Sequence, residues 1–358
     1  MPDFLSNEEI VIAARKNIGK GPWDYLVGGS ESETTLRRNR QAFDRLAFRP
    51  RVLRDVSKID TSTTFLGHRL RIPVLPAPIG SLQVFTPEGG IATAQASAEF
   101  GTVPVISTAT QPSPEDIAAA ADSPKIFQLY VRGDDAWVED LLARVVKAGY
   151  VALTLTVDTA VDSNRERPTI SRWIRPSRRV GFDPFFQARM TWERMDWIRS
   201  LVPGLPFMLK GVQTAEDAAL AVQHGVDVIW VSNHGGRQLD HALGAMDVLP
   251  EIVEAVQGRA QVIVDGGVQR GSDVLKAIAL GASAVCIGRL QGWGLAANGK
   301  AGLVRVLEIL ENEIISAMGL MGATSIDQLS PKDVVKVPPV GWSHEMSGWV
   351  NMPGERIL

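Results

Sequence analysis

The stretch Asp227-Val-Ile-Trp-Val-Ser-Asn-His-Gly-Gly-Arg-Gln-Leu-Asp240 joins a short apolar run to a polar turn that contains glycine. Residues 228–231 are all apolar, which is the pattern of a fully buried strand. The two glycines between His234 and Arg237 allow a tight turn that holds these side chains close together. An imidazole exchanges protons near neutral pH, and a guanidinium binds a carboxylate through two parallel hydrogen bonds. The stretch therefore fits an active-site loop for proton chemistry beside a carboxylate, or a loop whose polar groups only satisfy the backbone.

The pairing of an apolar run with a helical pattern occurs eight times after residue 72. The apolar runs are residues 74–77, 103–106, 126–130, 151–157, 206–209, 228–231, 261–264 and 284–287. The helical patterns that follow them are residues 88–100, 114–121, 134–148, 192–201, 214–224, 245–256, 271–280 and 302–318. Such alternation calls for a parallel sheet, and eight units close into a barrel. We therefore predict an α/β fold, a (β/α)8 TIM barrel with an N-terminal helical segment.

The segments on either side of the barrel complete a single expected domain over residues 1–358, with the N-terminal segment at 1–60, the barrel at 61–320 and a C-terminal tail at 321–358. Residues 7–17 and 34–44 have helical patterns, and the glycines from Gly21 to Gly29 are expected to stop the first of these segments. Residues 61–71 favour a small hairpin around Gly67. The tail resembles no pattern that we recognise, so it either wraps a neighbouring subunit or extends into solvent.

Composition is that of a soluble globular protein, with 45% hydrophobic and 22% charged residues. A formal net charge of −3 gives no reason to expect nucleic acid, which usually requires a strongly basic face. The only cysteine, Cys286, lies in an apolar run and is expected to pack rather than to react. The first residues lack a signal-peptide pattern, and no apolar run approaches the ~18 residues that span a bilayer. We expect a cytoplasmic protein without a transmembrane segment or a metal site.

Polar residues and glycines cluster where the predicted strands end, which is the rim from which barrel active sites are built. They are Pro78, Ile79, Gly80, Ser107, Gln128, Tyr130, Thr156, Asp158, Lys210, Ser232, His234, Asp265, Gly266, Gly267, Gly288 and Arg289. This consistent placement favours catalysis over a set of satisfied loop residues. The glycine-rich turns after the seventh and eighth strands favour a phosphate cradle, although glycines also serve simple tight turns.

Charged side chains at the ends of buried strands need partners of opposite charge. Lys210 fits either a Schiff-base lysine or a lysine beside an electron-rich cofactor ring. Asp158 would pair with a cation such as protonated His234 and orient its ring. Tyr25 and Tyr130 would either hydrogen-bond a substrate oxygen or pack in the core with the hydroxyl at the rim.

The motif Ser232-Asn-His-Gly-Gly-Arg-Gln-Leu-Asp240 resembles the active-site signature of the FMN-dependent α-hydroxy-acid oxidases and dehydrogenases, the family of glycolate oxidase, lactate oxidase and mandelate dehydrogenase. The resemblance extends from about Trp23 to Met318 and includes Gln128-Leu-Tyr130, Lys210-Gly211 and Asp265-Gly-Gly267. Locally, Pro78-Ile-Gly-Ser81 and Arg165-Glu-Arg167 are most similar to mandelate dehydrogenase.

The resemblance implies a role for each of these positions. His234 would be the base with Asp158 as its partner, and Lys210 would lie beside flavin N1. The substrate would contact Tyr25, Tyr130, Arg165, Arg237 and His234. FMN would contact Pro78, Ile79, Gly80, Ser107, Gln128, Thr156, Lys210, Ser232, Asp265, Gly266, Gly267, Gln269, Gly288 and Arg289. Gln269 replaces an arginine of the family pattern, so Arg270 or Arg289 would have to compensate for the lost charge at the phosphate.

The expected function is FMN-dependent oxidation of an (S)-2-hydroxy acid to the 2-oxo acid, with reoxidation of the flavin by O2 or another acceptor. The resemblance also implies a homotetramer. The alternatives are another FMN barrel enzyme, such as an isopentenyl-diphosphate isomerase of the flavin type, and a flavin-binding module without catalysis. Residues 165–189 carry seven arginines and fit a lid over an anionic substrate, a patch that binds acidic lipid, or a solvated basic loop.

Overall fold

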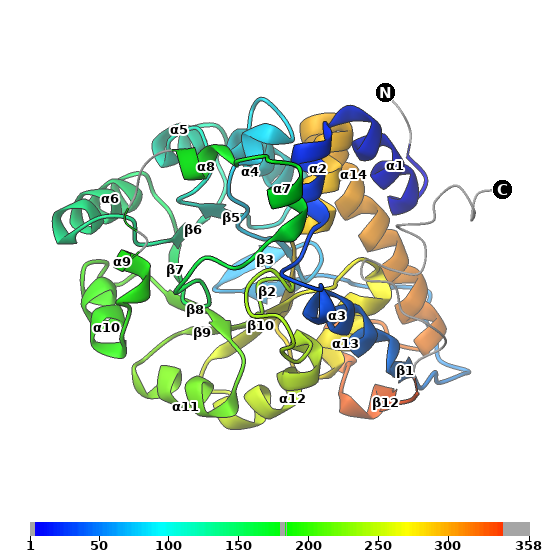
Figure 1. Ribbon diagram of the computed structural model, residues 1–358. Coiled ribbons are helices and arrows are strands. Elements are labelled where there is room, and N and C mark those ends of the chain that lie inside the picture. The colour runs from blue at the N-terminus through cyan, green and yellow to red at the C-terminus, as the bar shows by residue number, and fades with distance from the viewer. Residues whose placement is uncertain (1–3, 180–182, 184, 339–358) are drawn as a thin grey trace.

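Eight parallel strands form a nearly closed barrel with helices around it (Figure 1). The computed structural model describes residues 4–179, 183 and 185–338. The strands pair in the order β4-β11-β10-β9-β8-β7-β6-β5. Their bounds are β4 (Val74–Pro76), β5 (Val105–Ser107), β6 (Ile126–Leu129), β7 (Ala152–Thr156), β8 (Phe207–Val212), β9 (Val228–Val231), β10 (Gln261–Asp265) and β11 (Ala284–Ile287). The predicted fold class is confirmed, and each predicted strand matches an observed one to within three residues.

The helices that follow these strands are α4 (Gly90–Phe100), α5 (Pro114–Ala119), α6 (Asp135–Lys147), α10 (Trp192–Ser200), α11 (Ala215–Gln223), α12 (Ala245–Val256), α13 (Gly271–Ala279) and α14 (Arg289–Met321). Several begin at a side chain that caps the first turn, as Asp134 does for α6 and Thr214 for α11. The range of α14 contains a break at Asn298 and Gly299, whose backbone is not helical. The predicted helix over residues 302–318 lies in the second part and is confirmed, whereas the first part of α14 was not predicted. This glycine-rich first part is helical because it packs closely on the second part: a Cβ on Gly302 would lie 2.0 Å from Gly294 O.

A small hairpin packs against the interior of the barrel, as the turn around Gly67 predicted. Strands β2 (Thr63–Phe65) and β3 (His68–Leu70) pair through a two-residue turn in which Leu66 and Gly67 have φ of 48° and 78°. Phe65 and Leu70 pack against inward side chains of the barrel strands, among them Cys286, which is 1% exposed. The expectation that Cys286 packs inside a strand is therefore confirmed.

Three helices precede the barrel: α1 (Asn7–Asn17), α2 (Lys20–Val27) and α3 (Thr34–Asp44). The first and third match the prediction, and α1 lies beside α14 (Figure 1). The first helix ends at Asn17, before the glycines that were expected to stop it, but α2 was not predicted. Pro22 lies in the first turn of α2, where a missing backbone N–H costs nothing, so Gly21 and Pro22 do not prevent the helix.

The described part of the tail returns to the N-terminal segment instead of leaving the molecule. Strand β12 (Val334–Lys336) pairs antiparallel with β1 (Leu46–Phe48), after 3-10 turns at Ile326–Gln328 and Pro331–Asp333. Trp342 and Trp349 lie outside the described residues. The remaining short helices are η1 (Leu82–Val84), α7 (Glu166–Ile170), α8 (Pro176–Arg179) and α9 (Phe185–Ala188).

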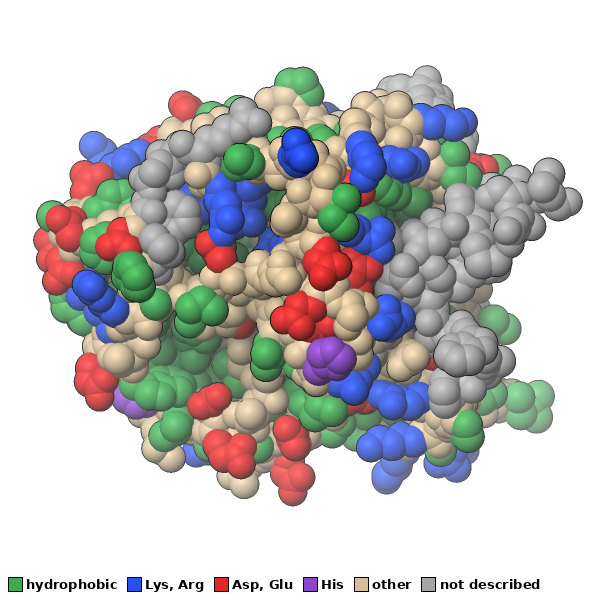
Figure 2. Space-filling model, in the orientation of Figure 1, with side chains coloured by type: hydrophobic (Ala, Val, Ile, Leu, Met, Phe, Trp, Pro, Cys, Tyr) green, Lys and Arg blue, Asp and Glu red, His purple; other side chains and the backbone are tan. Residues whose placement is uncertain are grey.

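Basic and acidic side chains are interspersed on the face shown in Figure 2, as the net charge of −3 leads one to expect. Within the described ranges, no helix is both long and apolar enough to cross a membrane.

A buried ion pair fixes α3 against the start of α13. Arg40 donates to both carboxylate oxygens of Asp273 at 2.7 and 2.8 Å, and the two residues are 5% and 1% exposed. Replacing Arg40 by leucine leaves Asp273 without this partner and is expected to lower the free energy of unfolding by about 3–5 kcal/mol in urea denaturation. The control is Arg45→Leu, whose exposed pair with Asp247 is worth about 1 kcal/mol or less. Equal losses in the two variants would contradict this account.

Candidate active site

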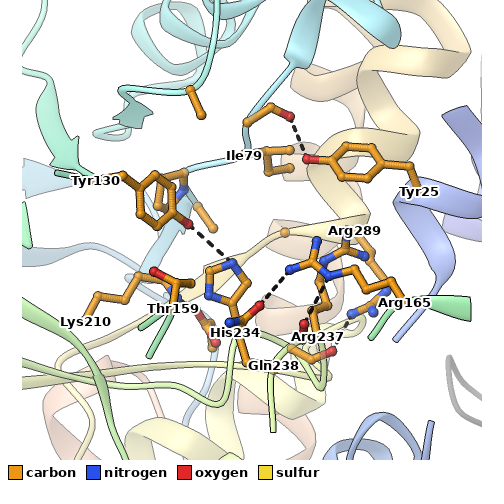
Figure 3. Close-up of a pocket in the computed structure, with 18 of the residues that line it drawn as sticks. Tyr25, Ile79, Tyr130, Thr159, Arg165, Lys210, His234, Arg237, Gln238 and Arg289 are labelled. Atoms are coloured by element: carbon orange, nitrogen blue, oxygen red, sulfur yellow. Dashed lines mark hydrogen bonds and ion pairs between the residues drawn. The ribbon is translucent and has the colours of Figure 1, made fainter. Parts of the chain in front are cut away.

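A deep cavity opens at the C-terminal ends of the barrel strands, as the polar strand ends predicted, and encloses about 1510 Å³ including solvent at its mouth (Figure 3). The predicted residues that line it are Tyr25, Pro78, Ile79, Gly80, Tyr130, Arg165, Lys210, His234, Arg237, Asp265, Gly266, Gly267, Gln269, Gly288 and Arg289. The other predicted residues lie directly behind this lining: Ser107, Gln128, Thr156, Asp158 and Ser232. Residues far apart in the sequence are thus brought to one cavity.

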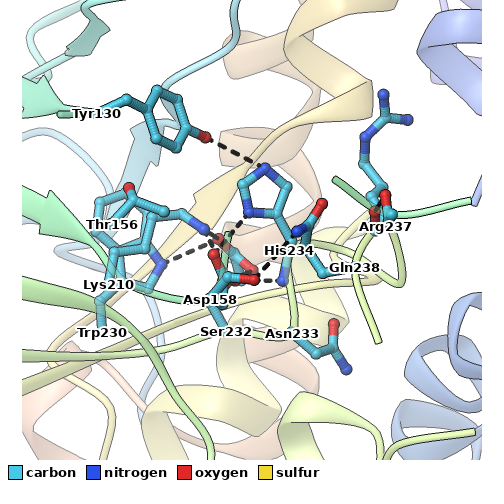
Figure 4. Close-up of polar contacts among 12 residues, drawn as sticks. Tyr130, Thr156, Asp158, Lys210, Trp230, Ser232, Asn233, His234, Arg237 and Gln238 are labelled. Carbon is cyan, nitrogen blue, oxygen red and sulfur yellow. Dashed lines mark hydrogen bonds and ion pairs between the residues drawn. The ribbon is translucent and has the colours of Figure 1, made fainter. Parts of the chain in front are cut away.

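The His234 ring lies between Asp158 and Tyr130 (Figure 4). Its Nδ1 is 3.0 Å from Asp158 Oδ1, and its Nε2 is 3.4 Å from the Tyr130 hydroxyl. A carboxylate only accepts hydrogen bonds, so Nδ1 carries the proton and Nε2 keeps a lone pair. Burial lowers the pKa of His234 below its ordinary value, and the opposing effect of Asp158 does not reverse this shift. His234 is therefore a neutral base at pH 7 whose free nitrogen faces the Tyr130 hydroxyl.

The backbone at His234 allows this placement because three consecutive residues are left-handed. His234, Gly235 and Gly236 have φ of 58°, 64° and 73°. A Cβ on Gly236 would lie 2.5 Å from Leu36 N, so only glycine fits there. The glycines of the opening stretch thus let α3 approach the loop that carries the histidine.

Lys210 is a buried ammonium held by Ser232 and Asp265. Its Nζ donates to Ser232 Oγ at 2.8 Å and lies 3.3 Å from Asp265 Oδ2. Ser232 Oγ and Trp230 Nε1 donate to the same carboxylate. Burial alone would lower the pKa of Lys210, but the charges of Asp265 and Asp158 raise it above its ordinary value. A Schiff base needs a neutral amine, so this geometry favours the second reading, a cation beside an electron-rich ring.

Three partly buried arginines share the other side of the cavity, and their hydrogen-bond partners among the described residues are neutral oxygens (Figure 3). Arg165 donates to Gln238 Oε1 at 2.8 Å, and Arg237 and Arg289 both donate to Gly28 O, at 2.7 and 2.9 Å. Burial and neighbouring arginine charges lower the pKa of Arg165 to about 9 and those of Arg237 and Arg289 to about 10. Among the described residues, no carboxylate lies within 4.0 Å of these three cations. The cavity therefore has an excess of positive charge that suits anionic ligands.

Several buried polar atoms beside the cavity lack a protein partner among the described residues: Gln128 Nε2, Thr156 Oγ1 and Gln269 Oε1. Such atoms are costly to bury unless a ligand or water pairs with them. Gly266 and Gly267 have φ of 99° and 92°, and a Cβ on Gly267 would lie 2.8 Å from Asn39 O. A glycine cradle, an ammonium and unpaired donors and acceptors fit a flat polar ring with a phosphorylated chain, as in FMN.

Some features of the site differ from the prediction or were missed. Arg270 pairs with Glu313 at 2.7 Å on the surface, so it does not compensate for Gln269. Arg289 does line the cavity. Gln238 and Thr159 also line it and were missed, although Gln238 belongs to the opening stretch. Its Nε2 donates to Asp158 O at 3.1 Å.

The family model described as FMN-dependent dehydrogenase matches residues 14–180 and 171–336. This chain belongs to that family. It is an FMN-dependent oxidoreductase that acts on CH–OH groups, as the resemblance implied. The Arabidopsis thaliana peroxisomal (S)-2-hydroxyacid oxidase GLO3 is 40% identical over 353 residues, which cover 93% of this chain and 97% of the relative. The L-lactate oxidase of a Nostoc species is 40% identical over 343 residues, covering 88% and 94%.

Solved structures of the family have the same architecture. A mandelate oxidase structure aligns with a TM-score of 0.87 at 38% identity and covers 94% of this chain and 99% of that chain. A chimera of (S)-mandelate dehydrogenase aligns with a TM-score of 0.87 at 34% identity, covering 93% and 99%. The predicted family and cofactor are therefore confirmed for this FMN-dependent oxidoreductase.

Proposed function

We propose that this FMN-dependent oxidoreductase converts an (S)-2-hydroxy acid to the 2-oxo acid, with His234 as the base and Arg165 and Arg237 as the carboxylate clamp. The observation that carries the proposal is the neutral imidazole, whose free Nε2 shares one cavity with two partly buried arginines that have no carboxylate partner among the described residues. The names of the relatives, which are oxidases of 2-hydroxy acids, support a redox reaction over an isomerisation.

The cofactor would be held by residues in and behind the cavity lining, three of which carry a polar atom without a protein partner among the described residues. Gln128, Thr156 and Lys210 would contact the ring and its side chain, while Gly267, Gln269 and Arg289 would hold the phosphate end. The oxidation removes two electrons from the α-carbon, and bound FMN supplies their acceptor. A protonated Lys210 would stabilise the negative charge that the flavin ring gains when it is reduced.

The chain's own residues bind the substrate and remove its proton. Arg165 and Arg237 bind the carboxylate and thereby fix the α-carbon. His234 Nε2 takes the proton that the substrate loses, and Asp158 stabilises the imidazolium that forms. Burial raises the pKa of Tyr130 to about 12, so its hydroxyl stays protonated and can donate to the substrate. The Tyr25 hydroxyl donates to Gly80 O at 2.9 Å and therefore accepts from the substrate hydroxyl.

The pH dependence follows from the direction of the His234 shift. The base works only when neutral, and burial places its pKa below the ordinary 6.5. We expect kcat/KM to be flat near pH 7 and to fall, as the pH decreases, below about 6.5. The measurement is a kcat/KM profile with a saturating electron acceptor. An acidic limb centred above pH 7 would contradict the assignment.

The neutral Gln269 leaves the phosphate cradle with one cation fewer than an arginine there would give. Gln269→Arg is expected to tighten FMN binding about tenfold, because a hydrogen bond to a charged group contributes roughly 1.5–3 kcal/mol. Fluorescence of free FMN during dilution of the holoprotein measures the dissociation constant. The exposed Gln257→Arg serves as the control, and equal or weaker FMN binding in Gln269→Arg would contradict the proposed phosphate position.

The reaction itself is tested by product analysis with a panel of (S)-2-hydroxy acids of different side chains. At least one acid is expected to give its 2-oxo acid, and H2O2 formed in equal amount would identify O2 as the acceptor. Absence of any 2-oxo acid with either O2 or an artificial acceptor would support the non-catalytic flavin-binding module instead.

We further propose a homotetramer in the cytoplasm and one domain over residues 1–358. Light scattering of the purified chain tests the subunit number.

A further inference from the structure

Gln187 is the only buried residue of α9, the short helix in the arginine-rich segment after β7. It is 6% exposed, whereas its neighbour Phe185 is 62% exposed. A glutamine is costly to bury unless its amide is hydrogen-bonded, and both of its polar atoms have partners. The side chain also lines the active-site cavity.

The amide of Gln187 bridges the ends of two neighbouring barrel strands. Its Oε1 accepts from Val131 N at 3.0 Å, and its Nε2 donates to Thr156 O at 2.6 Å. The last paired residues of β6 and β7 are Leu129 and Leu155, so the two backbone groups lie beyond the end of the ladder. A primary amide carries one C=O and N–H donors, as a peptide group does, and thus serves as one more rung between the strands.

This rung lies beside two groups of the active site. Val131 follows Tyr130, whose hydroxyl is 3.4 Å from His234 Nε2. Thr156 carries one of the buried hydroxyls that lack a protein partner among the described residues. The position of the Tyr130 backbone relative to β7 therefore depends on a side chain from a different segment.

We propose that Gln187 is a positioning residue that holds Tyr130 in place for the reaction and links the segment 165–189 to the reacting groups. The proposal rests on the proposed function, in which Tyr130 donates to the substrate. Gln187 itself acts through the backbone at Val131 and Thr156. A glutamate would keep the acceptor but lose the donor, and a methionine of similar length would lose both.

The test compares Gln187→Met in two backgrounds. We expect Gln187→Met to slow flavin reduction in the wild type by about tenfold or more, because a displacement of about 1 Å can cost up to 10²-fold. In a Tyr130→Phe background, the same change should alter the rate by no more than about twofold, the scatter of independent sites. The exposed Gln257→Met is the control. FMN content and melting temperature are measured for every variant.

Hydrogen exchange of the holoprotein gives a readout that does not depend on turnover. The Val131 amide should exchange faster in Gln187→Met and remain protected in Gln187→Glu, which keeps the acceptor and also serves if the methionine variant folds poorly. Equal rate losses in both backgrounds, or unchanged exchange at Val131, would overturn the proposal. A Tyr130→Phe variant as fast as the wild type would instead refute the role of Tyr130 within the proposed function.

Discussion

Replacing His234 by alanine is expected to slow reduction of the flavin by substrate by about 10²- to 10⁴-fold, the usual contribution of a general base. The physical reason is the geometry at Nε2: it is the nitrogen left without a proton once Nδ1 donates to Asp158 at 3.0 Å. Alanine removes the acceptor for the substrate proton, while the groups proposed to hold FMN, among them Lys210 and Arg289, stay in place. The protein should therefore remain yellow.

Anaerobic stopped-flow absorbance of the flavin measures this effect directly. His68→Ala is a suitable control because His68 lies on the β3 hairpin, outside the active-site cavity. A His234→Ala variant that is reduced as fast as the wild type would refute the base. Loss of bound FMN in this variant would contradict the separation of the base from the groups that hold the cofactor.

Replacing Arg165 by methionine is expected to lower kcat/KM by on the order of 10²- to 10³-fold, because removing one partner of a buried charge pair costs about 2–5 kcal/mol. In the free protein Arg165 has only neutral partners and is repelled by Arg237, so its removal should cost little stability. We therefore expect Arg165→Met to lower kcat/KM while the melting temperature of the protein stays unchanged.

Steady-state kinetics together with thermal denaturation separate these two effects. Arg189→Met, an exposed arginine of the same segment, is the matched control. If both variants lose activity equally, then the segment acts by its overall charge and the clamp assignment is wrong. A large drop in melting temperature for Arg165→Met alone would point to a structural role of the guanidinium.

The barrel was predictable from the sequence because each strand and its helix carry their own periodic signal. The first part of α14 was not, because Gly292 and Gly294 weaken its helical pattern, and Gly294 packs closely on Gly302 of the second part. Helix α2 was missed for a related reason: Gly21 and Pro22 suggest an interruption, yet proline is compatible with a first turn. Local preference was overridden by tertiary packing in the first case and by position within the helix in the second.

The candidate site was predictable where a residue type marks a strand end, as Lys210 and His234 do. It was not predictable where the direction of a side chain decides. Arg270 points to the surface because its guanidinium forms an ion pair with Glu313, which lies on another helix. Gln187 lies in a segment without a periodic signal, and its importance appears only when Val131 N and Thr156 O are seen to need partners.

The central claim is that His234, Lys210 and the arginine pair converge on one FMN and one 2-hydroxy acid. Its most direct test is anaerobic single turnover of the purified holoprotein with a panel of (S)-2-hydroxy acids, following flavin absorbance. The account predicts that at least one acid bleaches the flavin and yields one 2-oxo acid per FMN, while its (R)-enantiomer does not. Flavin that stays oxidised with every acid, or a colourless protein that does not bind added FMN, would contradict it.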